Sequence, residues 1–420
     1  MPFITRQAKL GSHFRSQVQL GNECKVGGTG VSPVQAQAKA CGYKLLSREL
    51  ETKADKKQVS KMRRKHEDFH DGAKDGLTPL EPLELNKIED FDQLLKAMGQ
   101  TAFGGRSLGE AADVLEAMLL DPDCTVVGTF SGAMSVAKMG LLICDMIDRG
   151  WLQAIVTTGA LVAHGFIETL GRVHYKYPEN VPDRVLFQQG YNRIYDTLEM
   201  EANLDYAEDV FRSVLEKLDQ DQVWSSAGLC RELGKYLSEH SGAPGILRNA
   251  YLKGVPVFIP AFTDSELGLD LAGYMVRGAL AAGQEFRAAL GALSLQFNPF
   301  LDLGAYAQQA LTAKKLGIFT IGGGVPRNWA QQVAPYLELL STRLQIELPE
   351  VRFHYGVRIC PEPAHWGGLS GCTFKEGVSW GKFVSPEEGG RFAEVLCDAT
   401  IAWPLLLKGV SQRLEKGQTK

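Results

Sequence analysis

The sequence predicts an α/β protein built on a doubly wound, mostly parallel sheet with helices on both faces. Six short runs of apolar and β-branched residues recur along the chain, and each has the length of a strand that is buried on both faces. Longer segments with apolar residues at helical spacing lie between several of these runs. Strands that alternate with helices are typical of a parallel sheet with crossover helices, so we expect a Rossmann-like arrangement.

The order of the predicted elements begins with two helices, at residues 88–98 and 108–120. Asp121-Pro122-Asp123 ends the second of them. The six predicted strands are residues 124–130, 154–158, 255–262, 317–322, 353–359 and 393–397. The helices predicted between the strands include residues 135–149, 204–218 and 329–346.

The composition is that of an ordinary globular protein: 420 residues, of which 45% are hydrophobic and 22% are charged. This balance excludes a fibre, a disulfide knot and a wholly disordered chain. The sequence contains no uncharged apolar run of about 18 residues, so we expect no membrane span and a cytoplasmic location. Eight cysteines are scattered without a CxxC pair, which predicts reduced thiols, no disulfides and no metal site.

The net charge of −4 conceals a basic N-terminal segment. Residues 1–65 contain 14 Lys and Arg but 4 Asp and Glu, so the rest of the chain is acidic. The segment resembles a nucleic-acid-binding arm or a transit peptide in charge, but its Gly/Ser/Gln content and lack of periodicity fit a disordered extension better. We therefore expect a basic, disordered extension over residues 1–65 and a catalytic domain over residues 66–420. The acidic domain favours cationic ligands over nucleic acid.

Small polar residues follow three of the predicted strands, where open α/β sheets collect their ligands. Ser131 and Ser135 follow the first strand, Thr158-Gly159 follows the second, and Gly322-Gly323-Gly324 follows the fourth. Hydroxyls and free backbone N–H groups at such turns suit phosphates, so three of them together predict a bound dinucleotide. The alternative is a set of tight connections, and no GxGxxG fingerprint is present.

Two carboxylates also lie at strand ends, Asp264 and Asp398. Either side chain would accept hydrogen bonds from ribose hydroxyls, and either would equally serve as a helix N-cap. The spacing leaves both interpretations open.

Lys382 is the candidate nucleophile, at the end of the run Glu376-Gly-Val-Ser-Trp380-Gly-Lys382. Burial beside an aromatic wall lowers the pKa of a lysine and leaves a neutral amine that can form an imine. The alternative is an ordinary surface lysine.

These motifs resemble those of the deoxyhypusine synthase family over roughly residues 75–410. The run that ends at Lys382 is similar to the family's most specific motif, in which the lysine carries an aminobutyl group as an imine. Further similar runs are Phe130-Ser131 with Ser135, Val156–Thr158, Pro260–Asp264 with Leu267-Gly268, Gly322–Val325, and Cys397–Ala399 followed by Pro404-Leu-Leu. The resemblance implies that NAD is bound by Ser131, Ser135, Thr158, Gly159, Asp264, Gly323, Asp398 and Ala399.

The departures from the family pattern fall on residues that grip the amine substrate. Asn328 replaces a family histidine, Leu269 replaces an aspartate that recurs one place later as Asp270, and Gly367–Gly371 lacks the acid of its counterpart. The segment after Thr158 reads Ala163-His164, where the family has acidic residues or His-Asp. This pattern resembles the deoxyhypusine synthase-like subgroup. We expect Glu376, Trp380, Asn328 and Asp270 to bind substrate, and His164 to be either a general base or a structural histidine.

The resemblance implies an NAD-dependent transferase that moves an aminoalkyl group from a polyamine such as spermidine through a lysine imine. The acceptor is either a protein lysine or a small diamine, which would give a homospermidine-like product. A non-catalytic NAD-binding homologue is the third possibility, although the retained motif at Lys382 argues against it. The resemblance also implies a homotetramer.

Overall fold

The structure is a computed structural model that describes residues 64–418 and divides the chain into two units, residues 1–78 and 79–420. The described part of the first unit contains one short 3-10 helix, η1 (His66–Asp68). The predicted disordered extension over residues 1–65 lies almost wholly outside the described residues. The features that follow all belong to the second unit.

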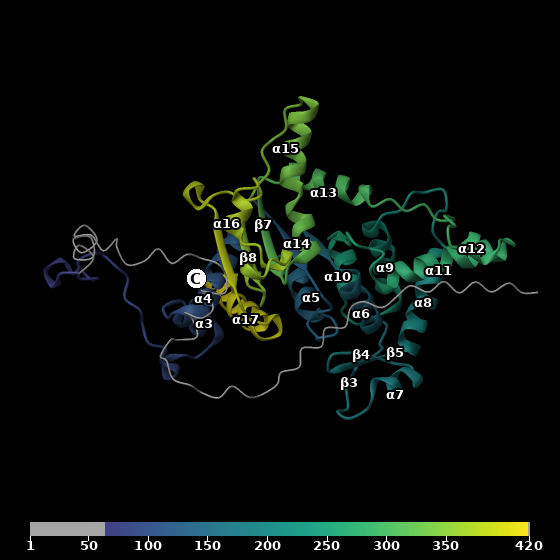
Figure 1. Ribbon diagram of the computed structural model, residues 1–420, viewed down its shortest axis with the longest axis horizontal. Coiled ribbons are helices and arrows are strands. Elements are labelled where there is room, and N and C mark those ends of the chain that lie inside the picture. The colour runs from purple at the N-terminus through teal and green to yellow at the C-terminus, as the bar shows by residue number, and fades with distance from the viewer. Residues whose placement is uncertain (1–63, 419–420) are drawn as a thin grey trace, which may run out of the picture. The chain divides into compact units, whose positions relative to one another are not determined.

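A six-stranded parallel sheet forms the centre of the second unit (Figure 1). The strand order is β6-β2-β1-β7-β8-β9, so among these six strands the third, second and first lie on one side and the fourth, fifth and sixth on the other. This is the doubly wound order of Rossmann-like folds, and it confirms the predicted fold class. The strands are β1 (Cys124–Phe130), β2 (Ala154–Thr157), β6 (Val257–Phe258), β7 (Lys315–Ile321), β8 (Phe353–Ile359) and β9 (Arg391–Val395).

Helices cover both faces of this sheet, as alternate residues of the same strands show. Val126 and Ile155 pack into one core cluster with α4 and α17, whereas Val127 and Val156 pack into a second cluster with α13, α14 and α15. The helices are α3 (Phe91–Gly99), α4 (Phe103–Leu120), α5 (Gly140–Asp148), α6 (Gly159–Thr169), α7 (Asp183–Gln188), α8 (Glu201–Leu215), α9 (Ser226–His240), α10 (Ile246–Lys253), α11 (Glu266–Ala281), α12 (Phe286–Ala289), α13 (Phe300–Thr312), α14 (Gly324–Gln331), α15 (Val333–Leu344), α16 (Phe374–Val378) and α17 (Ala399–Gln418). Short 3-10 helices are η2 (Leu85–Lys87), η3 (Ala364–Trp366), η4 (Leu369–Gly371) and η5 (Pro386–Glu388).

Three predicted elements differ from the structure for identifiable reasons. The strand expected at residues 255–262 is only Val257–Phe258, because Pro256 and Pro260 flank it and cannot donate ladder hydrogen bonds. The single helix expected at residues 329–346 is divided into α14 and α15, where Pro335 removes an N–H and its ring crowds the preceding turn. The helix expected from residue 135 begins at Gly140, after turns in which Lys138 has a φ of 63°.

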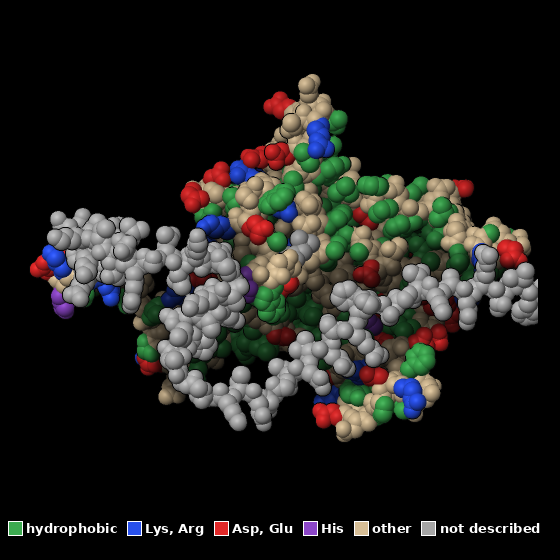
Figure 2. All heavy atoms as spheres, viewed as in Figure 1, with side chains coloured by type: hydrophobic (Ala, Val, Ile, Leu, Met, Phe, Trp, Pro, Cys, Tyr) green, Lys and Arg blue, Asp and Glu red, His purple; other side chains and the backbone are tan. Residues whose placement is uncertain are grey.

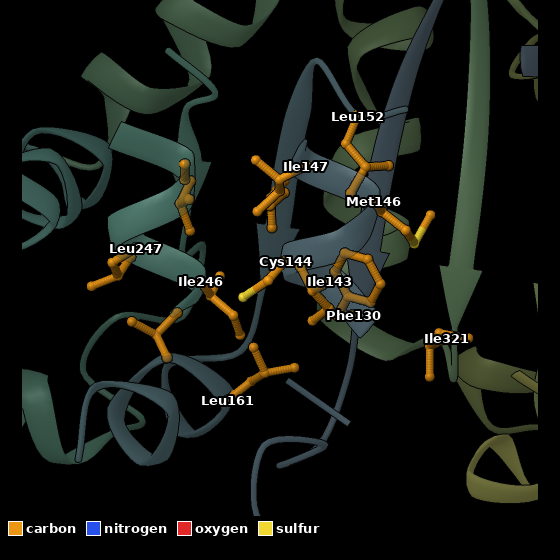
Figure 3. Packing of buried hydrophobic residues seen from close by; sticks show 14 of the residues in the cluster. Phe130, Ile143, Cys144, Met146, Ile147, Leu152, Leu161, Ile246, Leu247 and Ile321 are labelled. Carbon is orange, nitrogen blue, oxygen red and sulfur yellow. The ribbon is translucent and has the colours of Figure 1, made fainter. Parts of the chain in front are cut away.

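The larger core cluster joins β1 and β7 to α5, α6 and α10 (Figure 3). Phe130, Ile143 and Leu161 are fully buried there. Cys144 lies among them, and burial raises the pKa of its thiol to about 12, so it behaves as a small hydrophobic residue. All six cysteines in the described part of the chain are free thiols.

A second, smaller sheet was not predicted: β3 (Tyr175–Lys176), β5 (Thr197–Met200) and β4 (Tyr191–Ile194) pair antiparallel in the order β3-β5-β4. Its strands are two to four residues long and carry mixed polar side chains, which gives no clear period of two. The sheet lies in the segment that connects α6 to α8.

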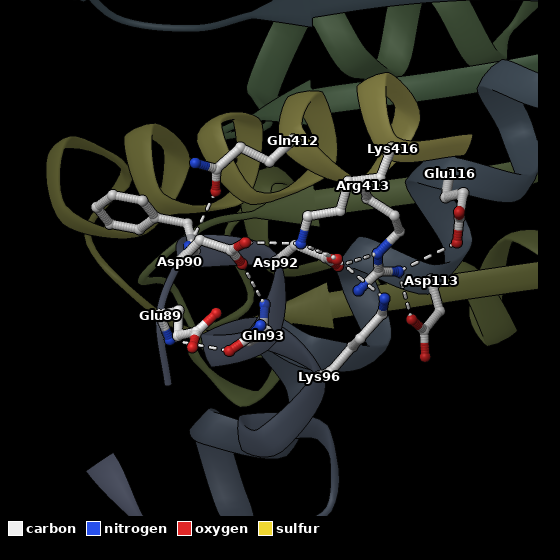
Figure 4. Close-up of polar contacts among 11 residues, drawn as sticks. Glu89, Asp90, Asp92, Gln93, Lys96, Asp113, Glu116, Gln412, Arg413 and Lys416 are labelled. Atoms are coloured by element: carbon white, nitrogen blue, oxygen red, sulfur yellow. Dashed lines mark hydrogen bonds and ion pairs between the residues drawn. The ribbon is translucent and has the colours of Figure 1, made fainter. Parts of the chain in front are cut away.

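A buried ion network fastens α17 to α3 and α4 (Figure 4). Asp92 is 1% exposed and accepts hydrogen bonds from Arg413 Nε at 2.7 Å, Lys96 Nζ at 2.9 Å and Lys416 Nζ at 3.2 Å. Arg413 also contacts Asp113 at 2.7 Å. This network therefore connects α17 with α3 and α4, the first two α-helices of the second unit. Among the described residues, no helix is long and apolar enough to cross a membrane.

Candidate active site

Lys382 lies in a tight turn that follows α16. Gly381 has a φ of 67°, which favours glycine, and the backbone N–H of Lys382 donates to the Gly377 carbonyl at 3.1 Å. The carbonyl of Lys382 accepts from Phe353 N at 2.9 Å, so the residue is held against the start of β8. The turn therefore fixes where the lysine side chain begins.

The Lys382 side chain is buried, with 9% of the residue exposed, and its Nζ donates a hydrogen bond to Asn328 Oδ1 at 3.1 Å. Asn328 belongs to α14, which follows the triple glycine. The Trp380 ring lies with its centroid 5.9 Å from the same Nζ. The structure thus brings together two residues that are 54 positions apart in the sequence.

A cavity of about 290 Å³ opens at this lysine. Four residues that we predicted for catalysis or substrate binding line it, namely Lys382, Asn328, Glu376 and Trp380. Arg327 also lines it, and the sequence analysis did not single this residue out. Its position directly before Asn328, a predicted substrate-binding residue, was the one feature of the sequence that could have indicated its place in the site.

The electrostatics of the cavity favour a neutral lysine. Burial lowers the pKa of Lys382, and the positive charge of Arg327 lowers it further, against smaller opposing effects of Cys372 and Glu376. Arg327 is itself 2% exposed, and burial together with Arg358 lowers its pKa to about 10. The surface-lysine alternative is therefore wrong for Lys382.

The switch point of the sheet lies between β1 and β7, because the chain moves outward from β1 in one direction and from β7 in the other. Ser131 follows β1, and its Oγ accepts a hydrogen bond from Gly323 N at 3.2 Å and donates to the Gly323 carbonyl. Gly322 and Gly324 have φ angles of 78° and 59°, a region that favours glycine. The predicted residues after these two strands therefore do meet.

The residues after β2 serve mainly to shape the start of α6. Thr158 is the N-cap of this helix, and its hydroxyl donates to the Gly132 carbonyl at 2.5 Å. A Cβ at Gly159 would lie 2.3 Å from the Ser265 side chain, so only glycine allows this close approach. Ser135 is fully buried, and its hydroxyl donates to the Leu161 carbonyl at 2.8 Å. This hydroxyl is already engaged inside the core, which differs from the predicted cofactor contact.

The two strand-end aspartates differ in the structure, because only one of them caps a helix. Ser265 is the N-cap of α11, so the capping alternative is wrong for Asp264, whose side chain is exposed. Asp398 does cap α17, because its Oδ1 accepts from Thr400 N at 2.7 Å and from Thr400 Oγ1 at 2.5 Å. Ala399 is buried as the first residue of that helix.

Asp270 lines a different cavity, of about 440 Å³, together with Glu208 and Glu266. Burial and these two neighbouring carboxylates raise the pKa of Asp270 to about 7. His164 is buried in α6 and contacts Glu199, so it belongs to neither the Lys382 cavity nor this one.

The comparison with known proteins agrees with these motifs. The family model described as Deoxyhypusine synthase matches residues 93–410. A protein named Probable deoxyhypusine synthase 2 from Methanosarcina mazei is 32% identical over 337 residues, which cover 80% of this chain and 90% of that protein. Its namesake from Archaeoglobus fulgidus is 32% identical over 74% of this chain and 95% of that one. A deoxyhypusine synthase-like protein from Chlorobaculum parvum is 32% identical over 74% of this chain and 84% of that one. The chain belongs to the deoxyhypusine synthase family.

Proposed function

We propose that the protein is an NAD-dependent transferase that moves an aminobutyl group from a polyamine through an imine on Lys382. The observation that carries the proposal is the buried amine of Lys382, which opens into a cavity and has a lowered pKa. A neutral amine carries the lone pair that imine formation requires. Reductive trapping of an aminobutyl fragment on Lys382 tests the proposal directly.

The residues around Lys382 support this chemistry. Asn328 Oδ1 accepts a hydrogen bond from Nζ, which would help to position the amine at the cavity that both residues line. The carboxylate of Glu376 lines the same cavity and would pair with an ammonium group of the substrate. Trp380 would cover the alkyl chain, because its ring is an exposed apolar wall beside Nζ.

The carboxyl edge of the sheet fits a dinucleotide. Its switch point carries the Ser131 hydroxyl and the left-handed glycines Gly322 and Gly324, while Thr158 and the N–H groups that begin α6 lie at the end of the neighbouring strand. Ser131, Thr158, Gly159, Gly323 and Ala399 would hold NAD through backbone and hydroxyl contacts, and Asp264 and Asp398 through ribose hydroxyls. NAD supplies hydride acceptance and hydride return when it is bound.

The acidic cavity at Asp270 would bind a further ammonium group. The pKa of the Asp270 carboxyl is raised by burial and by the neighbouring Glu208 and Glu266, so a bound cation would restore the charged form of Asp270. Asp270 and Glu376 are the two acidic residues among those that we predicted to bind substrate. The acceptor that we favour is a protein lysine or a small diamine, and a non-catalytic NAD-binding homologue is the alternative class.

A homotetramer is also part of the proposal. Figure 2 shows hydrophobic side chains gathered on the face that carries α13 and α15. Phe300, Leu301, Leu339 and Leu344 are all exposed there. An exposed apolar patch of this kind favours a contact between subunits.

Asp398 caps α17 and is also proposed to bind a ribose of NAD, and a substitution that separates these two roles tests the NAD site. Replacing Asp398 by Ser keeps an N-cap for α17, since Ser caps as well as Asp, but it removes the carboxylate. We expect an unchanged thermal midpoint and NAD binding that is weaker by about 1–3 kcal/mol, as measured by calorimetric titration. Asp398→Ala serves as the control that loses both the cap and the carboxylate. An NAD affinity equal to the wild type in Asp398→Ser would leave Asp398 as a cap alone.

The charge of Arg327 is expected to set the pH below which the rate of adduct formation falls, which is the acidic limb of the pH–rate profile. Adduct formation needs neutral Lys382, so its rate falls as the pH drops below the lysine pKa, which Arg327 lowers. Replacing Arg327 by Gln should raise the pKa of Lys382 and move this limb to higher pH. The measurement is the rate of reductive trapping across a pH series. Arg327→Lys keeps the charge and should leave the limb in place, and an equal shift in both variants would contradict the electrostatic explanation.

A further inference from the structure

Two histidines and a glutamate meet in the interior outside both cavities. His164 comes from α6, His174 from the loop before β3, and Glu199 from β5. The ligand atoms of these side chains all lie within 4.8 Å of one another, and all three residues are buried. We propose that His164, His174 and Glu199 bind a divalent transition-metal ion, with Zn²⁺ as the expected occupant. The proposal is independent of the transferase activity.

The three facing atoms form a triangle of suitable size. His164 Nδ1 lies 3.3 Å from Glu199 Oε2 and 3.4 Å from His174 Nε2. In a tetrahedral site with metal–ligand bonds of about 2.0–2.1 Å, neighbouring ligand atoms lie about 3.3–3.4 Å apart. The third side, from His174 Nε2 to Glu199 Oε2, is 2.6 Å and must lengthen by about 0.7 Å for that geometry. An ion would replace this hydrogen bond together with the longer contacts of His164 Nδ1 with Glu199 Oε2 and His174 Nε2.

Outer partners orient two of the three ligands, as they do in protein metal sites. Glu199 Oε1 accepts from Asn203 Nδ2 at 2.7 Å and from Met200 N at 3.0 Å, which leaves Oε2 to face the histidines. His174 Nδ1 lies 3.3 Å from Glu168 Oε1 and 3.0 Å from Lys138 Nζ, so both outer groups hold this side of the ring and Nε2 faces Glu199. His164 Nε2 lies 4.0 Å from Glu266 Oε1.

The donor set selects the class of metal. Two imidazole nitrogens with one carboxylate suit Zn²⁺ and related first-row ions, whereas Mg²⁺ and Ca²⁺ prefer oxygen ligands throughout. Three protein ligands leave one tetrahedral position for a water molecule. The sequence analysis predicted no metal site because it examined cysteine spacing, and these ligands are histidines and a glutamate separated by up to 35 positions.

The three ligands lie on three different elements, so an ion would cross-link them. It would join the small sheet, through β5, to α6, the helix that follows β2 of the central sheet and begins at Gly159. A metal that binds only the folded chain raises the stability of the fold. We therefore expect Zn²⁺ to raise the thermal midpoint of the full-length protein.

The experiment measures metal content and metal affinity on the full chain after dialysis against a chelator. We expect about one Zn²⁺ per chain on readdition, a higher thermal midpoint, and Co²⁺ absorption bands typical of a four-coordinate site. Glu199→Gln keeps the side-chain shape and its contact with Asn203 but removes the ligand charge, so it should weaken Zn²⁺ binding by about 100-fold or more. Glu168→Gln, which alters an outer partner alone, should weaken it by about 10–100-fold.

The matched control is His240→Gln, which removes an exposed histidine at the end of α9 and should bind Zn²⁺ as the wild type does. Circular dichroism establishes that each variant is folded. A folded wild-type protein that binds neither Zn²⁺ nor Co²⁺ at micromolar concentration would overturn the proposal, as would wild-type affinity in Glu199→Gln. In either case the cluster would be a hydrogen-bonded histidine–glutamate group without an ion.

Discussion

Replacing Lys382 by Arg is expected to abolish transfer, with a loss on the order of a thousandfold or more, because the nucleophile of the covalent step is removed. Arg keeps a long basic side chain at the position but cannot form the imine. In the wild type, NAD, spermidine and borohydride should leave a reduced aminobutyl adduct on the peptide that contains Lys382. Mass spectrometry of the digested protein measures this adduct.

The matched control for that experiment is Lys375→Arg, a neighbouring exposed lysine that lines a different cavity. It should leave the adduct on Lys382 at the wild-type level. Spermidine is the first donor to test, and the altered positions Asn328, Leu269 and Ala163 make related polyamines the next. If no polyamine gives a trapped adduct or NADH absorbance while NAD still binds, the transferase proposal fails and the non-catalytic homologue is the better account.

Replacing Asp92 by Asn is expected to destabilise the protein by about 3–5 kcal/mol, because it leaves the buried guanidinium of Arg413 without its main counter-charge. The side-chain shape is conserved, so the effect reports the charge. Urea denaturation followed by circular dichroism measures the free energy of unfolding. Asp113→Asn is the control, since Asp113 contacts the same guanidinium but its side chain is 60% exposed, and we expect a loss below about 1 kcal/mol.

The same network predicts the sign of a pH effect. Burial opposes ionisation of Asp92, but hydrogen bonds from Arg413, Lys96 and Lys416 outweigh it and hold the pKa of the carboxyl below its usual value. A carboxyl with a lowered folded-state pKa stabilises the fold above its unfolded pKa of about 3.9, and this stability is lost as the pH falls below that value. The wild type should therefore lose more stability than Asp92→Asn between about pH 4 and pH 2. Equal slopes in the two proteins would contradict the assignment.

The main sheet could be predicted from the sequence because its strands are apolar on both faces. The ranges expected for β1 and β8 coincide with the structure: residues 124–130 are mostly apolar and β-branched, and residues 353–359 are mostly apolar with His354 and Arg358 among them. The small sheet could not be predicted in this way. Its strands Tyr175–Lys176 and Tyr191–Ile194 are short and partly exposed, so their pairing depends on neighbours distant in the sequence.

The Lys382 site was predicted in part because its motif is local. The run from Glu376 to Lys382 forms the end of α16 and the turn after it, and the sequence named the lysine, the tryptophan and the glutamate together. Its partner Asn328 was recognised only as a departure from a family pattern, and Arg327 was missed. Both reach the lysine from another helix, and the charge of a distant residue leaves no signal beside Lys382.

The sequence by itself determined the alternation of buried strands and helices, because this alternation depends on side chains that are close along the chain, and it named Lys382 as the candidate nucleophile through a local motif. Only the tertiary structure decided which strand-end aspartate caps a helix, since a capping contact depends on where the next helix begins, and the ribose contacts of both aspartates stay predictions. It also decided that Lys382 is buried beside Arg327 and that His164 meets His174 and Glu199. Burial and charge pairing depend on distances between residues of separate helices and strands, and the order of residues along the chain does not give those distances.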